Sequence, residues 1–186
     1  MAARDEILNR LRAASPKAVA LPDLSRFAPP RAHDVRERFG KSVVEVGGRV
    51  ANGFDEVPEF AGARKIVSLA PGIAGNVDLA AVRDPHDLHD VDFCIVPAAL
   101  GVAENGACWI EDHGGANRAV CYLAQHIGIV VSAASLVHDM HEAYERIALK
   151  PGFAMFLSGP SKTADIEQSL VIGAHGPRSC TVVITP

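Results

Sequence analysis

The stretch "DFCIVPAALGVAENGACWIED", from Asp92 to Asp112, decides the fold class. It begins with an apolar run at 92–98 that is typical of a buried strand, and it ends with a second strand-like run at 107–112. Asn105-Gly106 lies between strand-like runs, and this dipeptide is the strongest short signal of a β-hairpin. We therefore expect an antiparallel hairpin, with Asn105 and Gly106 at the centre of a type I′ turn.

Around this hairpin, short β-branched runs alternate with helical stretches. Further strands are expected at 65–69, 128–132, 153–159 and 180–185, and helices at 33–46, 135–149 and 163–176. Gly47-Gly48 should end the first of these helices, because glycine accepts a left-handed cap. Strands separated by helices favour parallel pairing through crossovers. The pattern predicts an α/β fold whose mostly parallel sheet is flanked by helices and carries an antiparallel hairpin.

The N-terminal segment differs from the rest of the chain. Residues 4–14 place Ile7, Leu8 and Leu11 at helical spacing, and Ser15-Pro16 ends that pattern. The segment 15–31 contains four prolines and little periodicity, which is typical of an extended arm. We expect a helix and a Pro-bearing arm over residues 1–31, followed by one domain over 32–186.

Composition excludes several classes of protein. The 186 residues carry a formal net charge of −4 and no block of like charge, so we expect no nucleic-acid partner. The longest apolar runs are too short for a membrane span, and the charged N-terminus does not resemble a secretory signal, so we expect a cytoplasmic protein. Four widely spaced cysteines form no C-x-x-C pair, which predicts reduced, buried thiols and no metal or iron–sulfur cluster in this chain.

Glu104 admits two interpretations. A glutamate beside a tight turn is commonly a solvated residue without any chemical role. The neighbours Ala98, Ala99, Gly101, Val102 and Ala103 are all small, however, and small residues let a ligand approach the backbone. This neighbourhood favours a reactive carboxylate.

The run "SGPSKTADIEQSLVIGAHGPR", Ser158 to Arg178, is the second candidate. Gly159-Pro160 should end a strand, and Ser161 or Thr163 should cap a helix whose first turn holds Asp165 and Glu167. Free N–H groups at such a helix start can receive a phosphate or carboxylate. A second anion contact is expected near the end of the run, from His175, Gly176 and Arg178. The alternative is a capped helix followed by a turn, with no ligand; the spacing excludes a P-loop.

Histidines occur in two pairs three residues apart, His86 with His89 and His138 with His141. Metal ligands do occur at this spacing on a helix. Both pairs stand in acidic runs without a matching Cys or His, so we favour solvated surface positions. His113 lies closer to the hairpin and to the suspected site.

The run from Gly159 to Ile184 resembles the C-terminal signature of the LUD-domain family, which reads Gly-Pro-Ser-x-Thr-Ala-Asp-Ile-Glu, an apolar stretch, then Gly-x-His-Gly-Pro. "VAENGA" (102–107) is similar to the Ala-Glu-x-Gly turn of that family, and "RDEILNRLRAA" (4–14) to its first helix. The resemblance spans nearly the whole chain, although this chain is shorter than many members. It implies a fold shared with ribose-5-phosphate isomerase and the CoA transferases.

The resemblance also implies a function. Family members act beside two iron–sulfur partner proteins that oxidise L-lactate to pyruvate, so the clusters are expected in the partners. One group of CoA transferases carries Ser-Glu-Asn-Gly with a nucleophilic Glu, and Ala103-Glu104-Asn105-Gly106 differs from it in the first residue. That gives Glu104 a precedent by analogy of fold.

Two classes of function stay open, and a stand-alone binding or regulatory module is a weaker third. In the first, the chain is an accessory subunit that binds a small carboxylate or a partner. In the second, it is an acyl- or CoA-transferase-like enzyme with Glu104 as the catalytic nucleophile. We favour the first class, because the sequence has no cluster of Lys or Arg to bind the phosphates of CoA. A homo-oligomer is left open.

In either case we expect one pocket with two walls. Its ligand-binding residues would be Asn105, Gly106, Gly159, Ser161, Thr163, Asp165, Glu167, His175, Gly176 and Arg178.

Overall fold

The computed structural model describes residues 3–15, 19–20, 22–23, 33–112, 114–148, 152–163 and 170–186. The chain divides into two compact units, Met1–Arg31 and Ala32–Pro186. The first unit contains helix α1 (Ala3–Ala14), which is amphipathic as predicted and has Asp5 and Glu6 in its first turn, where the helix dipole favours negative charge. Most of the expected arm at 15–31 lies outside the described residues.

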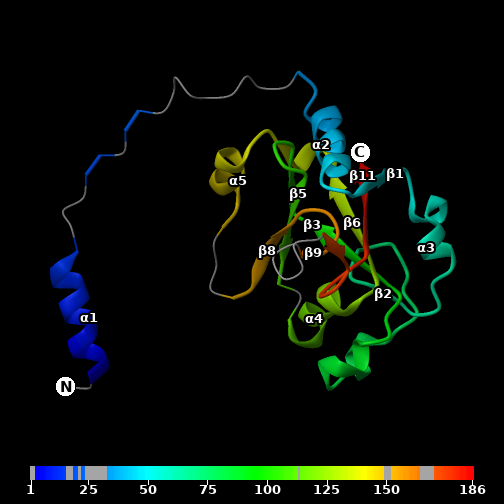
Figure 1. Ribbon diagram of the computed structural model, residues 1–186, viewed down its shortest axis with the longest axis horizontal. Helices are drawn as coiled ribbons and strands as arrows, with labels where there is room; N and C mark the ends of the chain where they lie inside the picture. Colours follow the sequence, from blue (N-terminus) through cyan, green and yellow to red (C-terminus); the bar gives the residue numbers. More distant parts are fainter. Residues whose placement is uncertain are drawn as a thin grey trace. The chain divides into compact units, whose positions relative to one another are not determined.

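A five-stranded sheet forms the centre of the second unit, and all its described pairings are parallel. Its strands, in spatial order, are β1 (Arg49–Ala51), β11 (Ser179–Thr185), β6 (His126–Ser132), β3 (Phe93–Ala98) and β2 (Ile66–Ser68). Figure 1 shows β11, in red, alongside β6. The predicted parallel α/β sheet is thus confirmed.

The hairpin belongs to a separate sheet of four strands, ordered β7 (Leu136–Val137), β4 (Leu100–Val102), β5 (Ala107–Glu111) and β8 (Ala154–Leu157). β4 and β5 pair antiparallel, as predicted. The expected two-residue turn is wrong, because Val102 pairs with Ala107 and four residues connect the strands. We call this the mixed sheet.

Alternation along the strands explains how the layers pack. Cys94 and Val96 of β3 face the same core cluster as Cys108 and Ile110 of β5, so this cluster lies between the two sheets. The opposite face of the parallel sheet packs around Phe93 and Ile95, and the opposite face of the mixed sheet around Trp109 and Val102. This period of two is the expected behaviour of strands buried on both faces.

Helices and short helical turns cover the sheets and connect their strands. They are α2 (Val35–Glu45), η2 (Phe54–Glu56), α3 (Pro58–Ala61), η3 (Leu79–Ala81), η4 (Pro85–Leu88), α4 (Gly115–Leu123), η5 (Ala133–Ser135) and α5 (Met140–Arg146). Asp34 caps α2 by accepting a hydrogen bond from the Glu37 amide, and Gly47 follows the helix at φ 83°, as the Gly47-Gly48 pair predicts. Ala143 of α5 packs in the outer core of the mixed sheet.

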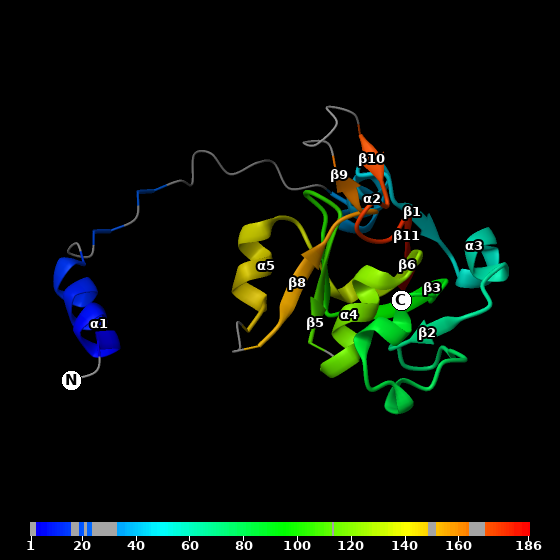
Figure 2. The same ribbon diagram turned by 60° about the horizontal axis from the view of Figure 1, so that its bottom comes forward.

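Two predicted helices need correction. The helix expected at 135–149 begins only at Met140, because Asp139 caps it and Leu136–Val137 pairs with β4 instead. At 163–176, Thr163 and Val171 pair in a two-stranded ribbon of β9 (Lys162–Thr163) and β10 (Val171–Ile172), seen above β8 in Figure 2. In the described part of this run, Leu170, Val171 and Ile172 are exposed and give a helix no buried face, and β-branched residues favour strands.

Candidate functional site

Strands β4, β7 and β8 of the mixed sheet run in the same direction and stop at the same end of the sheet. β4 is parallel to β7, and both β4 and β8 are antiparallel to β5. The segments that leave them therefore converge, and hydrogen bonds join them. The Ser158 hydroxyl donates to the Asn105 carbonyl at 2.8 Å, and the Met140 amide donates to Glu104 Oε2 at 3.0 Å. We call the residues Glu104, Asn105, Met140 and Ser158 the Glu104 edge.

Two residues of helix α2 contact the hairpin turn and fix its position. The buried Ser42 hydroxyl donates to the Ala103 carbonyl at 2.6 Å. Gly106 has φ +66°, and a Cβ built on it would come within 2.8 Å of the Val43 amide nitrogen. Asn105 Oδ1 accepts a hydrogen bond from the Ala107 amide at 3.0 Å. Glycine is thus required at 106 both by backbone conformation and by close approach, and Glu104 stands on a rigid frame.

The Glu104 side chain is exposed, although its carboxylate has a backbone partner. Arg38 lies beside the turn, where its Nη2 donates to the Glu104 carbonyl at 3.5 Å and its Nη1 lies 3.2 Å from Glu45. A carboxylate in this setting can accept hydrogen bonds from a ligand, pair with a cationic side chain of a partner, or attack an electrophile.

The amides around Glu104 bear on the choice between these roles. The Gly106 amide donates to the Val102 carbonyl, the Ala107 amide to Asn105, and the Met140 amide to Glu104 itself. Acyl transfer needs donors preorganised for an oxyanion. These three amides already have partners inside the protein, so they are not free to stabilise an oxyanion in this conformation.

The second candidate segment begins at the same edge. Gly159, at φ +71°, lies against α2, since a Cβ there would come within 2.5 Å of the Val46 carbonyl oxygen. Ser161 contacts the end of the run, because its amide donates to the Pro177 carbonyl at 2.9 Å and a Cβ on Gly176 would lie 3.0 Å from its own Cβ. The segment at 158–161 therefore touches the hairpin turn at one end and the run at 176–177 at the other.

The structure brings together part of the predicted set. Asn105 contacts Ser158, the residue before Gly159, and Ser161 contacts Gly176.

Other members of the predicted set lie elsewhere. Thr163 pairs in β9 and does not cap a helix. His175 and Arg178 are exposed, and the Arg178 amide donates to the Gln125 carbonyl near the start of β6. Asp165 and Glu167 lie outside the described residues. Within the described ranges no hydrogen bond or ion pair joins Glu104 to Thr163, His175 or Arg178, so a single pocket with two walls stays a prediction.

Sequence reasoning missed a polar cluster at the amino end of the parallel sheet. Arg49 forms two hydrogen bonds with Glu59, at 2.9 and 3.0 Å, and these bonds lower the pKa of Glu59 to about 2. His126 Nδ1 lies 2.8 Å from the Ser179 hydroxyl oxygen, and burial lowers the pKa of His126. These residues are far apart in the sequence, and β11 beside β6 brings Ser179 opposite His126.

Metal-binding groups are dispersed in the described part of the chain, where no cluster of three or more His, Cys, Asp or Glu side chains could hold an ion. The four cysteines are buried and unpaired, as predicted. Burial raises the pKa of the Cys108 thiol well above its usual value and that of Cys180 to about 12, which makes both poor nucleophiles. The predicted surface positions are confirmed for His86, His89 and His141, which are exposed, whereas His138 is partly buried. His113 lies outside the described residues.

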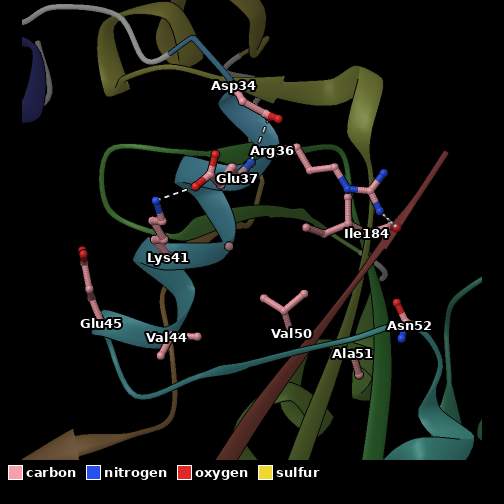
Figure 3. Close-up of a pocket in the computed structure, with 11 residues that line it drawn as sticks. Asp34, Arg36, Glu37, Lys41, Val44, Glu45, Val50, Ala51, Asn52 and Ile184 are labelled. Atoms are coloured by element: carbon pink, nitrogen blue, oxygen red, sulfur yellow. Dashed lines mark hydrogen bonds and ion pairs between the residues drawn. The ribbon is translucent and has the colours of Figure 1, made fainter.

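A groove that the sequence did not indicate runs between α2 and β1 (Figure 3). Its volume is about 660 Å³, and Val44, Val50 and Ile184 form its apolar lining. Charged residues surround them, with Lys41 paired to Glu37 and Arg36 donating to the Ile184 carbonyl. Ser42 does not line this groove, since its side chain is buried and donates to the Ala103 carbonyl of the hairpin turn.

The chain is similar to one protein family and to known proteins of one name. The family described as LUD domain matches residues 64–185. Lactate utilization protein C of Geobacillus sp. (strain WCH70) is 25% identical over 196 aligned positions, which cover 97% of this chain and 78% of that protein. The protein of the same name from Halalkalibacterium halodurans is 34% identical over 101 positions, which cover 50% of this chain and 44% of that protein.

A solved structure shows the same fold. The crystal structure of a DUF162 family protein from Deinococcus radiodurans superposes with a TM-score of 0.60 at 17% identity, over 85% of this chain and 100% of that chain. Among the helices that the structure describes, none has the length and apolar character needed to cross a bilayer.

Proposed function

Since this chain belongs to the LUD domain family, we propose that it serves in lactate utilization, as an accessory subunit of a system that oxidises L-lactate to pyruvate. The observation that carries the proposal is the relationship to lactate utilization protein C, which extends over 97% of the chain. Iron–sulfur clusters would reside in partner proteins, and this chain would bind a small carboxylate or one of those partners.

The Glu104 edge is the part of the surface that we assign to contact with a partner protein. Its carboxylate is exposed, its backbone is fixed by Ser42 and Gly106, and its neighbouring segments carry the residues of the family signature. An exposed charge on a fixed frame is suited to specific pairing with a cationic group, because little conformational freedom is lost on binding.

Acyl transfer is the second candidate. In that reaction a Glu104 oxygen would bond to the acyl carbon of an acyl-CoA, the C–S bond would break, and CoA would leave as the thiolate. The match of Glu104-Asn105-Gly106 to the CoA-transferase turn favours this candidate, whereas the occupied amides around Glu104 weigh against it. Hydroxylamine added to protein and acyl-CoA would convert the anhydride into a hydroxamate at Glu104, which peptide mass analysis would detect.

The test of the accessory role uses extracts of the organism that encodes the chain. We expect deletion of the gene to abolish L-lactate-dependent dye reduction, and the wild-type gene to restore it. Glu104→Gln should fail to restore it, because the variant keeps the shape of the side chain and loses the charge. Glu145→Gln is the matched control, since Glu145 is an exposed glutamate of α5 outside the Glu104 edge. Full lactate oxidation in the deletion strain would contradict the proposal.

A further inference from the structure

The two edges of the parallel sheet differ in how they are covered. At the β2 edge, Asn76 Oδ1 accepts a hydrogen bond from the Ile66 amide at 2.8 Å, and the Asn76 amide donates to the Ile66 carbonyl at 2.9 Å. Gly75 lies so close that a Cβ on it would come within 2.7 Å of that carbonyl oxygen. At the other edge, β1 pairs with β11 and has no second strand partner among the described residues. A loop therefore closes one edge, whereas the described part of the chain leaves the other open.

The side chains of β1 do not oppose pairing with a further strand. A strand at the edge of a sheet directs N–H and C=O groups outward and is a template for another strand, unless a charge or a proline protects it. Arg49, the only charged residue of β1, is paired with Glu59 of α3 by two hydrogen bonds. The central residue, Val50, is 38% exposed. The β1 edge therefore presents an apolar side chain at its centre.

The groove between α2 and β1 extends this apolar surface. Val44 of α2 lines the groove beside Val50 and is 60% exposed (Figure 3). Two basic and three acidic residues also line the groove, which gives the lining a formal charge of only −1. Among them, Lys41 and Glu37 are exposed and pair with each other at 2.6 Å. Such a surface does not select a strongly acidic or basic partner, and it suits a surface that is equally apolar and nearly neutral.

We propose that the β1 edge and the groove between α2 and β1 form the interface of a homodimer. In this dimer, β1 of two copies pairs antiparallel about a twofold axis at Val50 and joins the two parallel sheets into one. Val50 then lies opposite Val50 of the second copy, and Arg49 lies opposite Ala51. Two β-branched side chains meet, and no like charges do, so the strand is complementary to itself.

Helix α2 fits the same axis. A Cβ on Gly40, at the middle of α2, would lie 3.8 Å from Val50 Cγ2, so an axis at Val50 passes close to the middle of this helix. The axis places the two copies of α2 beside each other in opposite directions. Residues before Gly40 then face residues after it, which brings Glu37 of one copy toward Lys41 of the other. A ladder of three residues is too small for a stable interface, and Val44 adds to the apolar area that the dimer buries.

Sedimentation velocity of the purified full-length protein, over a series of concentrations, tests the proposal. We expect an equilibrium between the monomer and a species of twice its mass. Val50→Lys should raise the dissociation constant about tenfold or more, because the new charge lies opposite its own copy. Val171→Lys is the matched control, since Val171 of β10 is 39% exposed, and it should leave the dissociation constant unchanged. A wild-type protein that stays monomeric throughout, or an equal effect of the two substitutions, would overturn the proposal.

Cross-linking gives a second measurement that does not depend on tolerance of a lysine at Val50. The four native cysteines are buried, so a short bismaleimide should react with an introduced thiol at the surface. We expect Val50→Cys to give a covalent dimer in high yield and Val171→Cys to give little. A yield in Val50→Cys no greater than in Val171→Cys would contradict the pairing of β1 with its own copy. Both experiments use the purified chain alone, and the proposal does not rest on a role in lactate utilization.

Discussion

The two sheets of this protein differ in how long their strands pair and in what they carry. In the parallel sheet, β11 and β6 pair from Ser179 with His126 to Thr185 with Ser132. In the mixed sheet, β4 pairs with β7 only at Gly101 with Leu136 and Val102 with Val137. The strands with long pairings are buried and form the framework of the domain. The short strands lead into the segments at the two ends of the mixed sheet. The Glu104 edge occupies one of those ends.

The contrast indicates a division of work between the sheets. A strand that pairs over many residues has its register set by alternating buried side chains, and its stability comes from that burial. A strand of two or three residues depends on close contacts at particular positions, such as Gly101 of β4 against Phe39 of α2. Substitutions in the parallel sheet should therefore reduce overall stability, and substitutions in the mixed sheet should affect the site.

The largest effect should come from truncating the same residue type in each sheet. Phe93 of β3 is fully buried against Phe54 and Phe60, so Phe93→Ala should lower the free energy of unfolding by about 3–5 kcal/mol. Phe156 of β8 is only half-buried, and Phe156→Ala should cost about 1–2 kcal/mol. Urea titration followed by circular dichroism measures both, and equal losses would remove the distinction between the sheets.

A smaller effect is expected at the turn of the mixed sheet. Gly106→Ala should lower the free energy of unfolding by about 2–3 kcal/mol, because Ala is strained at positive φ and its Cβ would meet the α2 backbone. Gly72→Ala is the matched control, since Gly72 has φ +78° and no atom within 4 Å of the added Cβ. The control should lose about 1 kcal/mol, and a loss as large as that of Gly106→Ala would show that close packing against α2 contributes nothing.

The same contrast explains how much the sequence could predict. The runs at 65–69, 92–98, 128–132 and 180–185 were recognisable because strands buried on both faces are continuously apolar. Strands β1, β4, β7, β9 and β10 were missed, since two or three residues carry no periodicity and most of their partners are distant in sequence. Leu136 and Met140 have helical spacing, yet the Asp139 cap separates a strand from a helix there.

The candidate site was predictable to a similar degree. Asn105-Gly106 identified the hairpin, and the signature at 158–178 identified the second segment. They meet at Asn105 and Ser158 because β4 and β8 run in the same direction and end at the same end of the mixed sheet. The convergence of segments at strand ends was predicted for the parallel sheet, and it occurs in the mixed sheet instead. Arg38, Ser42 and Met140 could not be assigned, since their contacts with the turn depend on how α2 and α5 pack.

A third, weaker effect should appear on acidification. The pKa of Glu59 falls from 4.5 in the unfolded chain to about 2 in the folded protein, so the stability from its pair with Arg49 is complete above pH 4.5 and is lost as the pH falls toward 2. Because Arg49 is 45% exposed, the contribution should be about 1 kcal/mol. Glu59→Gln should lose this part of the pH dependence in urea titrations between pH 5 and 2.

His126 acts in a different range of pH and can be separated from Glu59. Burial lowers the pKa of His126 below 6.5, so the unfolded chain takes up the proton first and stability falls as the pH drops through 6.5. Glu59 and Asp92 raise this pKa, whereas Arg178 and Arg49 lower it. Glu59→Gln should leave a decline below pH 6.5 in place, and its disappearance would show that the two groups titrate as one unit.

The smallest effect on stability is expected at Glu104. In Glu104→Gln the amide oxygen can still accept the hydrogen bond from Met140, so the free energy of unfolding should change by less than about 0.5 kcal/mol. Glu104→Ala removes the acceptor at the start of α5 and should cost about 1 kcal/mol. Thermal unfolding of both variants, measured beside lactate-dependent dye reduction, separates the two roles of the side chain. If the carboxylate serves function, Glu104→Gln and Glu104→Ala lose reduction equally although they differ in stability. If it is only a structural acceptor, reduction follows stability and the Gln variant stays active, and the Glu104 edge is then a turn that positions α5.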